Sequence, residues 1–521
     1  MRDLGIQRPA WKDVLKRHRF LALPAAHNAL AARMLAIPRP GQEEDRTRAL
    51  ARLAEREREL SRALGQVTGR PTRDDPWIEL DRVRTALPGD AVLVEIARFD
   101  VWDFQAQDRR RRWQPAHYAA WVIPAAGRGA VRLLDLGPAA ALDAAVAAAR
   151  QALRADPQAL RDRGEPDLER QARPALEALA QLVLTPLLPH LGPTRRWILS
   201  PDAALWLVPW AALPLDGGRY ALEDHEIAYV VSGRDLVPGG GRRPHGPALV
   251  MADPDFALDP DQARQAARDV LRHADGSSAD ELALRGTSGG LRLDAVPRLP
   301  GTAAEAKAIA PKLRAYAGVE PVVYTDRWAL EAVFKAFRQP RVVVLSTHGF
   351  FLEDQETQPQ DRPDLVLDPA RPRSGPLPEN PLLRCGLLLA GCSRRDPAGA
   401  GEDGVLTGME VVGTDLRGTE LVVLSACETG LGQVRNGEGV AGLRQAFQLA
   451  GAKAVVATLW QVPDKESARL MTGFFDNLAA GQGKAEALRA AQLALITSRR
   501  ERYGAAHPFF WAAFTVTGQG L

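Results

Sequence analysis

The sequence is 521 residues long, and its 46% hydrophobic and 25% charged residues are typical of a globular protein with a large core. Its 67 lysines and arginines nearly balance 64 acidic residues, and a net charge of +3 argues against direct binding of nucleic acid. We find no apolar N-terminal signal and no apolar window of about 18 residues, so we expect no membrane association. Three cysteines cannot form a disulfide framework, which favours a cytoplasmic location.

Residues 1–88 are predicted to be helical. Within them, residues 43–60 place apolar side chains at helical spacing among mixed charges, which favours an amphipathic docking helix over a free coiled coil. A second region follows, with predicted strands at 91–99, 117–124, 130–136, 196–200 and 227–231 and predicted helices at 139–154 and 168–188. The glycine-rich stretch 238–244 predicts a linker at the end of this region.

From residue 248 onward, short apolar runs alternate with helical patterns, which predicts a parallel sheet with helices on both faces and therefore an α/β fold. The predicted strands are 248–252, 320–324, 341–347, 386–390, 420–426 and 453–460, and the predicted helices are 303–317, 327–338, 438–450, 464–480 and 484–498. Residues 352–382 lack periodicity and predict a long surface loop beside His348, and residues 272–294 predict a similar insertion.

Two of these predicted strands end at reactive side chains. The run 341–347 is followed by His348 and Gly349, and the run 420–426 is followed by Cys427. Ligands of open α/β sheets bind beyond the carboxyl ends of the strands. If the two strands are neighbours, the histidine and the cysteine meet at that edge.

A histidine beside a cysteine suits one kind of chemistry. A thiol with a pKa of roughly 8.5 is only a few per cent ionised at neutral pH, and a nearby imidazolium lowers that pKa. The histidine can then donate a proton to a departing amine. Main-chain N–H groups near Gly349 and at Cys427 suggest an oxyanion site, because glycine lets a donor approach a carbonyl oxygen closely. The reaction class is acyl transfer, which needs no metal or organic cofactor.

Seven segments of the chain occur in an order that is found in a known family. They are His348-Gly349, the Ser-Ala-Cys-Glu-Thr-Gly segment 425–430, and the segments 199–213, 299–305, 437–447, 455–464 and 507–514. Together they resemble a CHAT domain, a member of the caspase and separase group of cysteine peptidases. The resemblance extends from about residue 45 to the end of the chain.

This resemblance implies a caspase-like three-layer α/β/α catalytic domain at 244–521. An inactive caspase-like half at 89–243 and a helical region at 1–88 would precede it. The implied activity is that of an endopeptidase in which Cys427 attacks the scissile carbonyl, His348 acts as acid and base, and donors near Gly349 and at Cys427 hold the oxyanion. Such peptidases act on one or a few protein partners, sometimes with an activating partner, and CHAT proteins often operate in bacterial immunity or regulated cell death.

Asp464 and Glu438 are candidate substrate-binding residues. Asp464 lies in a segment, 459–464, that resembles the separase segment whose acidic residue holds a basic side chain, which implies cleavage after Arg or Lys. Gln461 departs from that pattern, because separases often have a second acid there. The alternative role of Asp464 is that of a helix cap. Glu438 lies in the loop after Cys427, where it would contact substrate or an adjacent loop.

Two other functional classes were weighed against a peptidase. A CHAT module with an intact His348 and Cys427 can still be catalytically idle and act as a regulatory scaffold. The segment 437–442 matches G-x-G-x-x-G, which is typical of a nucleotide site. Ten residues separate it from the strand end at Ala426, however, whereas a dinucleotide fingerprint forms a tight turn directly after its strand.

Four further residues are expected to have structural roles. Cys385 and Cys392 lie on or beside an apolar run, and a cysteine there usually packs as a small hydrophobic residue. Trp206 and Trp210 could form an aromatic binding box, but packing at a domain interface is the favoured prediction.

Overall fold

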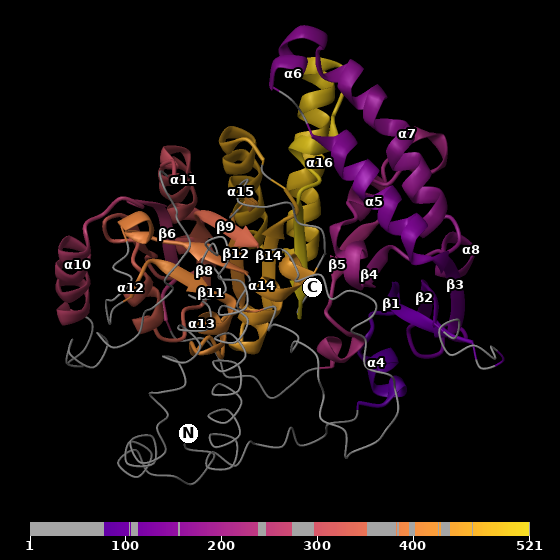
Figure 1. Cartoon of the computed structure of the whole chain (residues 1–521), viewed down its shortest axis with the longest axis horizontal. Helices are drawn as coiled ribbons and strands as arrows, with labels where there is room; N and C mark the ends of the chain where they lie inside the picture. The colour runs from indigo at the N-terminus through magenta and orange to yellow at the C-terminus, as the bar shows by residue number, and fades with distance from the viewer. Residues whose placement is uncertain are drawn as a thin grey trace, which may run out of the picture.

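The computed structural model describes residues 78–103, 105, 113–154, 157–237, 246–273, 296–351, 382, 385–394, 402–425, 427–428, 438–460 and 462–519. The predicted helix at 43–60, the linker at 238–244 and most of the two predicted insertions lie outside these residues. The described part of the chain is built around one long sheet with helices on both faces (Figure 1). The predicted three-layer α/β/α class is confirmed.

Eleven strands of the described residues form this sheet, in the order β3-β2-β1-β4-β5-β15-β14-β12-β8-β6-β7. The first half of the chain supplies β1 (Ala91–Trp102), β2 (Trp113–Pro124), β3 (Arg132–Pro138), β4 (Arg196–Ser200) and β5 (Glu226–Tyr229). The second half supplies β6 (Leu249–Pro254), β7 (Val322–Asp326), β8 (Val342–Ser346), β12 (Leu421–Leu424), β14 (Ala454–Thr458) and β15 (Phe514–Gly518). The two halves therefore share one sheet.

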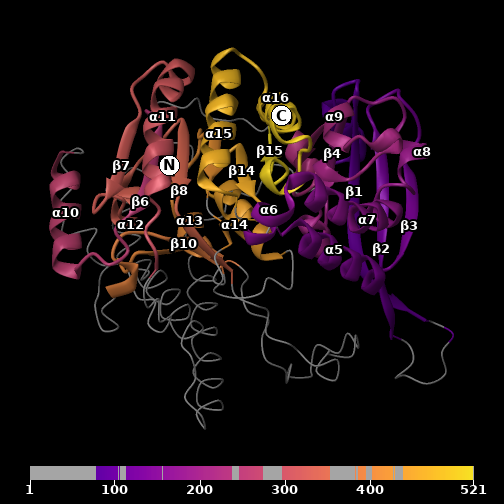
Figure 2. The ribbon, with the colours of Figure 1, turned by 90° about the horizontal axis from the view of Figure 1, so that it is seen from above.

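Alternation along the central strands explains why helices cover both faces. In β8, Val342 and Val344 pack into one hydrophobic cluster, whereas Val343 and Leu345 pack into another. Successive side chains of a strand point to opposite faces, so a strand that is apolar throughout must be covered twice. One cover consists of α11 (Pro300–Ala317), α15 (Asp464–Ala479) and α16 (Lys484–Tyr503), and the other of α10 (Pro260–His273), α12 (Glu331–Ala336), α13 (Gly408–Val412) and α14 (Glu438–Leu449) (Figure 2).

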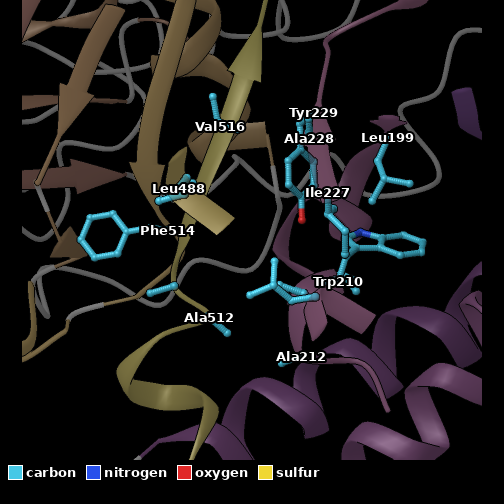
Figure 3. Close-up of a cluster of buried hydrophobic side chains, with 14 of the residues drawn as sticks. Leu199, Trp210, Ala212, Ile227, Ala228, Tyr229, Leu488, Ala512, Phe514 and Val516 are labelled. Atoms are coloured by element: carbon cyan, nitrogen blue, oxygen red, sulfur yellow. The ribbon is translucent and has the colours of Figure 1, made fainter. Parts of the chain in front are cut away.

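The direction of the strands reverses where the two halves meet. Strand β15 pairs antiparallel with β14 and parallel with β5, so β1, β4, β5 and β15 run opposite to the strands from β14 to β7. Figure 3 shows the apolar side chains that gather at this junction, with Phe514 and Val516 from β15, Ile227 and Tyr229 from β5, and Leu488 from α16. The shared core indicates that the halves pack as one body.

The helices of the first half cover its part of the sheet. They are α4 (Leu80–Ala86), α5 (Ala139–Leu153), α6 (Pro157–Arg163), α7 (Glu165–Val183), α8 (Leu188–Leu191) and α9 (Ala221–Asp224). In α5, Leu142, Val146 and Leu153 recur at helical spacing and are buried against the strands. None of the helices in the described residues is both long and apolar enough to cross a bilayer.

A second, smaller sheet lies beside the carboxyl ends of the central strands. Its order is β11-β10-β9-β13, with β9 (His348–Phe351), β10 (Cys385–Leu388), β11 (Val405–Thr407) and β13 (Cys427–Glu428). The prediction that 386–390 belongs to the parallel main sheet is wrong, because β10 pairs antiparallel with β9 and β11. A four-residue apolar run is buried in either sheet, so periodicity alone could not assign it.

Candidate active site

The ends of β8 and β12 bring the two predicted reactive residues together. These strands pair in parallel up to Leu424 opposite Leu345, and each chain then continues into the smaller sheet. There β9 and β13 also pair in parallel, with Cys427 opposite His348. Paired strands lie about 4.8 Å apart, so the backbones of the two residues are adjacent. The two strands are therefore neighbours, which is the condition under which the histidine and the cysteine were expected to meet.

The His348 side chain is buried and has a defined hydrogen bond. Its Nε2 lies 2.9 Å from the carbonyl oxygen of Pro297, so we assign the proton to Nε2 and leave Nδ1 as the acceptor nitrogen. The Phe256 ring packs against the imidazole, with 5.3 Å between the ring centroids. Burial lowers the pKa of His348 below its ordinary value, while the Pro297 carbonyl and the charge of Asp464 oppose this shift. The histidine is therefore biased towards the neutral form, which can accept a proton from a thiol.

Ion pairs fix the segment that carries Pro297. Arg298 donates through Nε and Nη2 to the two carboxylate oxygens of Asp253, at 2.9 and 2.8 Å, and through Nη1 to Asp326 at 2.8 Å. The N–H of Leu299 donates to the same Asp253 carboxylate at 3.0 Å. A bidentate pair of this kind fixes orientation as well as distance. Because Asp253 and Asp326 belong to β6 and β7, the Pro297 carbonyl is held relative to the main sheet.

The charge of Asp464 acts on His348, and Asp464 is not the N-cap residue of α15, the role that was the alternative to substrate binding. It is the first residue of α15, whose N-cap position is Pro463 with no side-chain cap hydrogen bond. A Cβ atom placed on Gly301 would come within 2.6 Å of Asp464 Cγ, so this exposed carboxylate packs against the first turn of α11. Its charge acts on both His348 and Glu305. A role of Asp464 in substrate specificity stays a prediction.

The other predicted site residues are placed by their backbones. Gly349 is buried in β9, next to His348 in the chain. The structure describes Cys427 and Glu438 through the backbone alone, and Glu438 is the first residue of α14. The oxyanion role of Gly349 and Cys427, and the substrate contact of Glu438, stay predictions.

Two candidate residues were missed by the sequence analysis. The Pro297 carbonyl gave no signal, because its partner His348 lies 51 residues away and any residue carries a carbonyl. Glu305, a buried carboxyl behind the two strand ends, did give one. It falls on the apolar face of the predicted helix 303–317, together with Ile309 and Leu313, where an acidic residue is unusual.

One group of carboxylates in the described residues has the spacing of a metal site. Oxygens of Glu331, Glu402 and Glu410 lie within 4.8 Å of one another. Lys335 Nζ, however, lies among them, at 2.5, 2.6 and 2.9 Å from the three carboxylates. The carboxylates raise the pKa of Lys335 well above its ordinary value, although burial opposes the shift. The Lys335 ammonium group thus occupies the position that a metal ion would take, and the cluster is a buried ion-pair network.

The four residues that were expected to have structural roles are all buried. Cys385 and Cys392 lie in the cores beside the smaller sheet. Trp206 and Trp210 belong to the large cluster that joins the two halves, and Trp210 Nε1 donates to the carbonyl of Leu205 at 3.3 Å. The predicted packing roles are confirmed.

Comparison with known proteins identifies the family of the chain. The sequence profile of the CHAT domain matches residues 173–519, so the chain belongs to the CHAT domain family. It is also similar to tetratricopeptide repeat protein 28 of Mus musculus, with 34% identity over 108 residues, and to that of Homo sapiens, with 32% identity over 117 residues. These matches cover 20% and 22% of this chain and only 4% of each relative.

Two solved structures have a weaker similarity to this chain, with low sequence identity and low TM-scores. The Arg-specific cysteine proteinase gingipain R has 12% identity and a TM-score of 0.36, and the match covers 66% of this chain and 67% of that one. The separase–securin complex of Saccharomyces cerevisiae has 11% identity and a TM-score of 0.30, and the match covers 99% of this chain and 28% of that one.

Proposed function

We propose that the chain is a cysteine endopeptidase that uses Cys427 and His348 to cleave a specific protein partner. The observation that carries the proposal is the parallel pairing that sets Cys427 opposite His348 at the ends of adjacent strands. The hydrogen bond from His348 Nε2 to Pro297 supports it, because a proton acceptor in catalysis needs a fixed tautomer. Membership in the CHAT domain family is consistent with it.

The reaction follows from these groups. The thiol proton of Cys427 passes to Nδ1 of His348, because Nε2 already carries the proton that is donated to Pro297. The thiolate sulfur forms a bond to the scissile carbonyl carbon, and main-chain N–H groups near Gly349 and Cys427 stabilise the oxyanion. The C–N bond then breaks, and the amine leaves with the proton from the imidazolium. Water hydrolyses the thioester in the second half of the reaction, with His348 as the base.

The substrate class rests on Asp464. An exposed carboxylate beside the candidate pair suits a basic side chain before the scissile bond, because an ammonium or guanidinium group forms charge-assisted hydrogen bonds with it. The substrate would be a protein partner that is cleaved after Arg or Lys, in a bacterial cytoplasm and in the setting of defence or regulated cell death. A second protein would activate the enzyme.

One observation favours a second candidate function. The His348 side chain is only 3% exposed, and a substrate must reach it for catalysis. A chain that keeps this closed state would be a catalytically idle CHAT scaffold. The two candidate functions differ in whether a partner protein opens the site: the peptidase would be activated in this way, and the scaffold would not.

Labelling of the thiol separates them. The full chain is treated with iodoacetamide, and peptide mapping by mass spectrometry follows Cys427 against Cys385 and Cys392, the two buried cysteines. If the chain is a peptidase, iodoacetamide should alkylate Cys427 much faster than the other two cysteines. Cys427→Ala should then abolish peptide cleavage, with a loss of more than ~10³-fold in rate. Cleavage by a clean Cys427→Ala preparation would end the peptidase assignment, and a Cys427 that reacts as slowly as the buried pair would favour the scaffold.

A further inference from the structure

Glu305 occupies a position where the fold calls for an apolar residue. In α11 the buried positions are 302, 305, 306, 309 and 313, which form one face of the helix. Glu305 lies in the middle of this face and is 2% exposed. A carboxyl group there loses its hydration, and this loss must be offset by hydrogen bonds. A leucine or alanine would fill the same position without that cost.

The hydrogen bonds of Glu305 lead to both strands of the candidate site. Ser346 Oγ donates to Oε1 at 3.3 Å, and Ser467 Oγ of α15 donates to Oε2 at 3.4 Å. Ser425 Oγ lies 3.3 Å from Ser467 Oγ and completes the chain of contacts. One carboxyl group therefore links the ends of β8, β12 and α15. Figure 2 shows α11 and α15 side by side.

Two of these serines, Ser346 and Ser425, lie at the ends of β8 and β12, just before the candidate site. Ser346 is two residues before His348, and Ser425 is two residues before Cys427. Both continue the side of the strand that faces α11 and α15, after Val344 in β8 and Val423 in β12. The N–H of Ser425 also donates to the carbonyl of Leu345 at 3.1 Å, so the two strand ends are tied by backbone as well as by side chain.

We propose that Glu305 is a positioning residue, whose carboxyl group holds the strand ends of Ser346 and Ser425 in the register that sets Cys427 against His348. This inference rests on the proposed function and deepens it. Glu305 does not touch substrate. It acts through the two serines, each two residues before a reacting side chain.

The protonation state of Glu305 is part of this role. Burial raises the pKa of Glu305 to about 7, the serine hydroxyls oppose the shift, and the charge of Asp464 adds to it. As a carboxylate, Glu305 accepts from Ser346 and Ser467 together; when protonated, it must donate at one oxygen, and the direction of one contact reverses. Of the charged groups on the packed elements, Asp464 faces the carboxyl, whereas Glu466 pairs with Arg499, and Lys312 pairs with Asp476. The strand ends contribute the uncharged serines, and the titratable His348 lies two residues after Ser346.

The test compares Glu305→Leu with Glu305→Gln in the full chain. The readouts are the iodoacetamide rate of Cys427 against pH, followed by peptide mapping, and the thermal melt. Glu305→Leu should have a melting temperature no lower than that of the wild type, because an apolar side chain suits the position. Its Cys427 should nevertheless react with iodoacetamide about 10- to 100-fold more slowly at neutral pH. Glu305→Gln should lose the inflection near pH 7 in that rate, because an amide does not titrate. Glu320→Gln, which removes an exposed carboxylate after the same helix, is the matched control and should match the wild type.

The outcomes separate this inference from the proposed function. A wild-type Cys427 that reacts as slowly as the buried cysteines refutes the peptidase itself. A reactive wild-type thiol whose rate and pH profile are unchanged in both Glu305 variants refutes the positioning role alone. If both Glu305 variants are unfolded, Ser346→Ala and Ser425→Ala each remove one contact at little cost in volume. A slower alkylation in either supports the role, and an unchanged rate in both overturns it.

Discussion

A buried ion pair joins α7 of the first half to α16 of the second, and its removal gives a sharp test of how the halves are held together. Arg499 donates through Nε and Nη2 to the two oxygens of Glu165, at 2.8 and 2.6 Å. Their side chains are 7% and 2% exposed. The N–H of His507 donates to the same Glu165 carboxylate at 2.8 Å. Arg499→Met would leave this carboxylate buried with the His507 N–H as its remaining partner among these groups.

The expected loss follows from that burial. Removing one partner of a buried pair costs about 3–5 kcal/mol, because the other charge stays away from water without compensation. The double variant Arg499→Met/Glu165→Gln removes both charges and keeps an acceptor for the His507 N–H. It should therefore recover at least half of the loss. Arg314→Met is the control, because it breaks a pair with Glu320 in which both side chains are 69% exposed, and it should cost about 0–1 kcal/mol.

Urea unfolding followed by tryptophan fluorescence measures these differences, since the chain has 11 tryptophans. The single variant should unfold at a lower urea concentration than the control, and the double variant should lie between the single variant and the wild type. The reasoning fails if Arg499→Met loses no more than Arg314→Met. It also fails if the losses in stability of Arg499→Met and of Glu165→Gln simply add to give the loss of the double variant. The effects of two residues that form one buried pair should not be additive.

Two further predictions concern specificity and pH. Asp464→Asn should lose most cleavage of peptides with Arg or Lys before the scissile bond while Cys427 is still alkylated, and a peptide-library profile dominated by acidic or apolar residues at that position would contradict it. Burial, with a smaller effect of Arg499, lowers the pKa of His507 to about 4 in the folded chain. This histidine stabilises the fold above its unfolded pKa of about 6.5, and this stability, on the order of 3 kcal/mol, is lost as the pH falls towards 4. His507→Asn should flatten the fall in urea stability between pH 7 and 4.5, and an equally steep fall in the variant would show that other groups cause it.

The sequence predicts the strands that carry the site better than their surroundings. The prediction for 196–200 matches β4 residue for residue, and 341–347 contains β8. The run 341–347 is rich in β-branched residues and is followed by His348 and Gly349, a pattern with few other interpretations, whereas 196–200 is a short apolar run that ends at a serine and a proline. Strand β15 was not predicted, although the segment 507–514 was recognised as part of the family pattern. Its role depends on β5 and β14, which come from different halves of the chain, and a local pattern cannot show such a partner.

In the candidate site, the sequence points to the candidate residues His348 and Cys427 but not to the groups that surround them. His348 and Cys427 were recognised because their residue types carry chemistry and both follow a strand. The contacts around these strand ends join residues that are far apart in sequence: 51 residues between His348 and Pro297, 41 between Ser346 and Glu305, and 162 between Ser467 and Glu305. Serines and a main-chain carbonyl are common everywhere, so tertiary structure alone gives them meaning here. Glu305 is the exception, because the helical periodicity of the sequence already places this acidic residue on the apolar face of α11.

The reversal of strand direction at β14 and β15 separates two edges of the sheet that have different chemistry. The chain continues from the ends of β8 and β12 to His348 and Cys427, whereas β1, β4 and β5 run the opposite way and end at the other edge. Ligand sites of α/β sheets lie at the carboxyl ends of strands, and a cavity of about 840 Å³ lies beside β1 and β4, lined by residues such as Glu95, Ser200 and Trp206. None of its lining residues is a histidine or a cysteine. The cavity is also lined by Gly442, Gln445 and Leu449 of α14, so both halves of the chain contribute to it, and the division into an inactive half at 89–243 and a catalytic half after it stays a prediction.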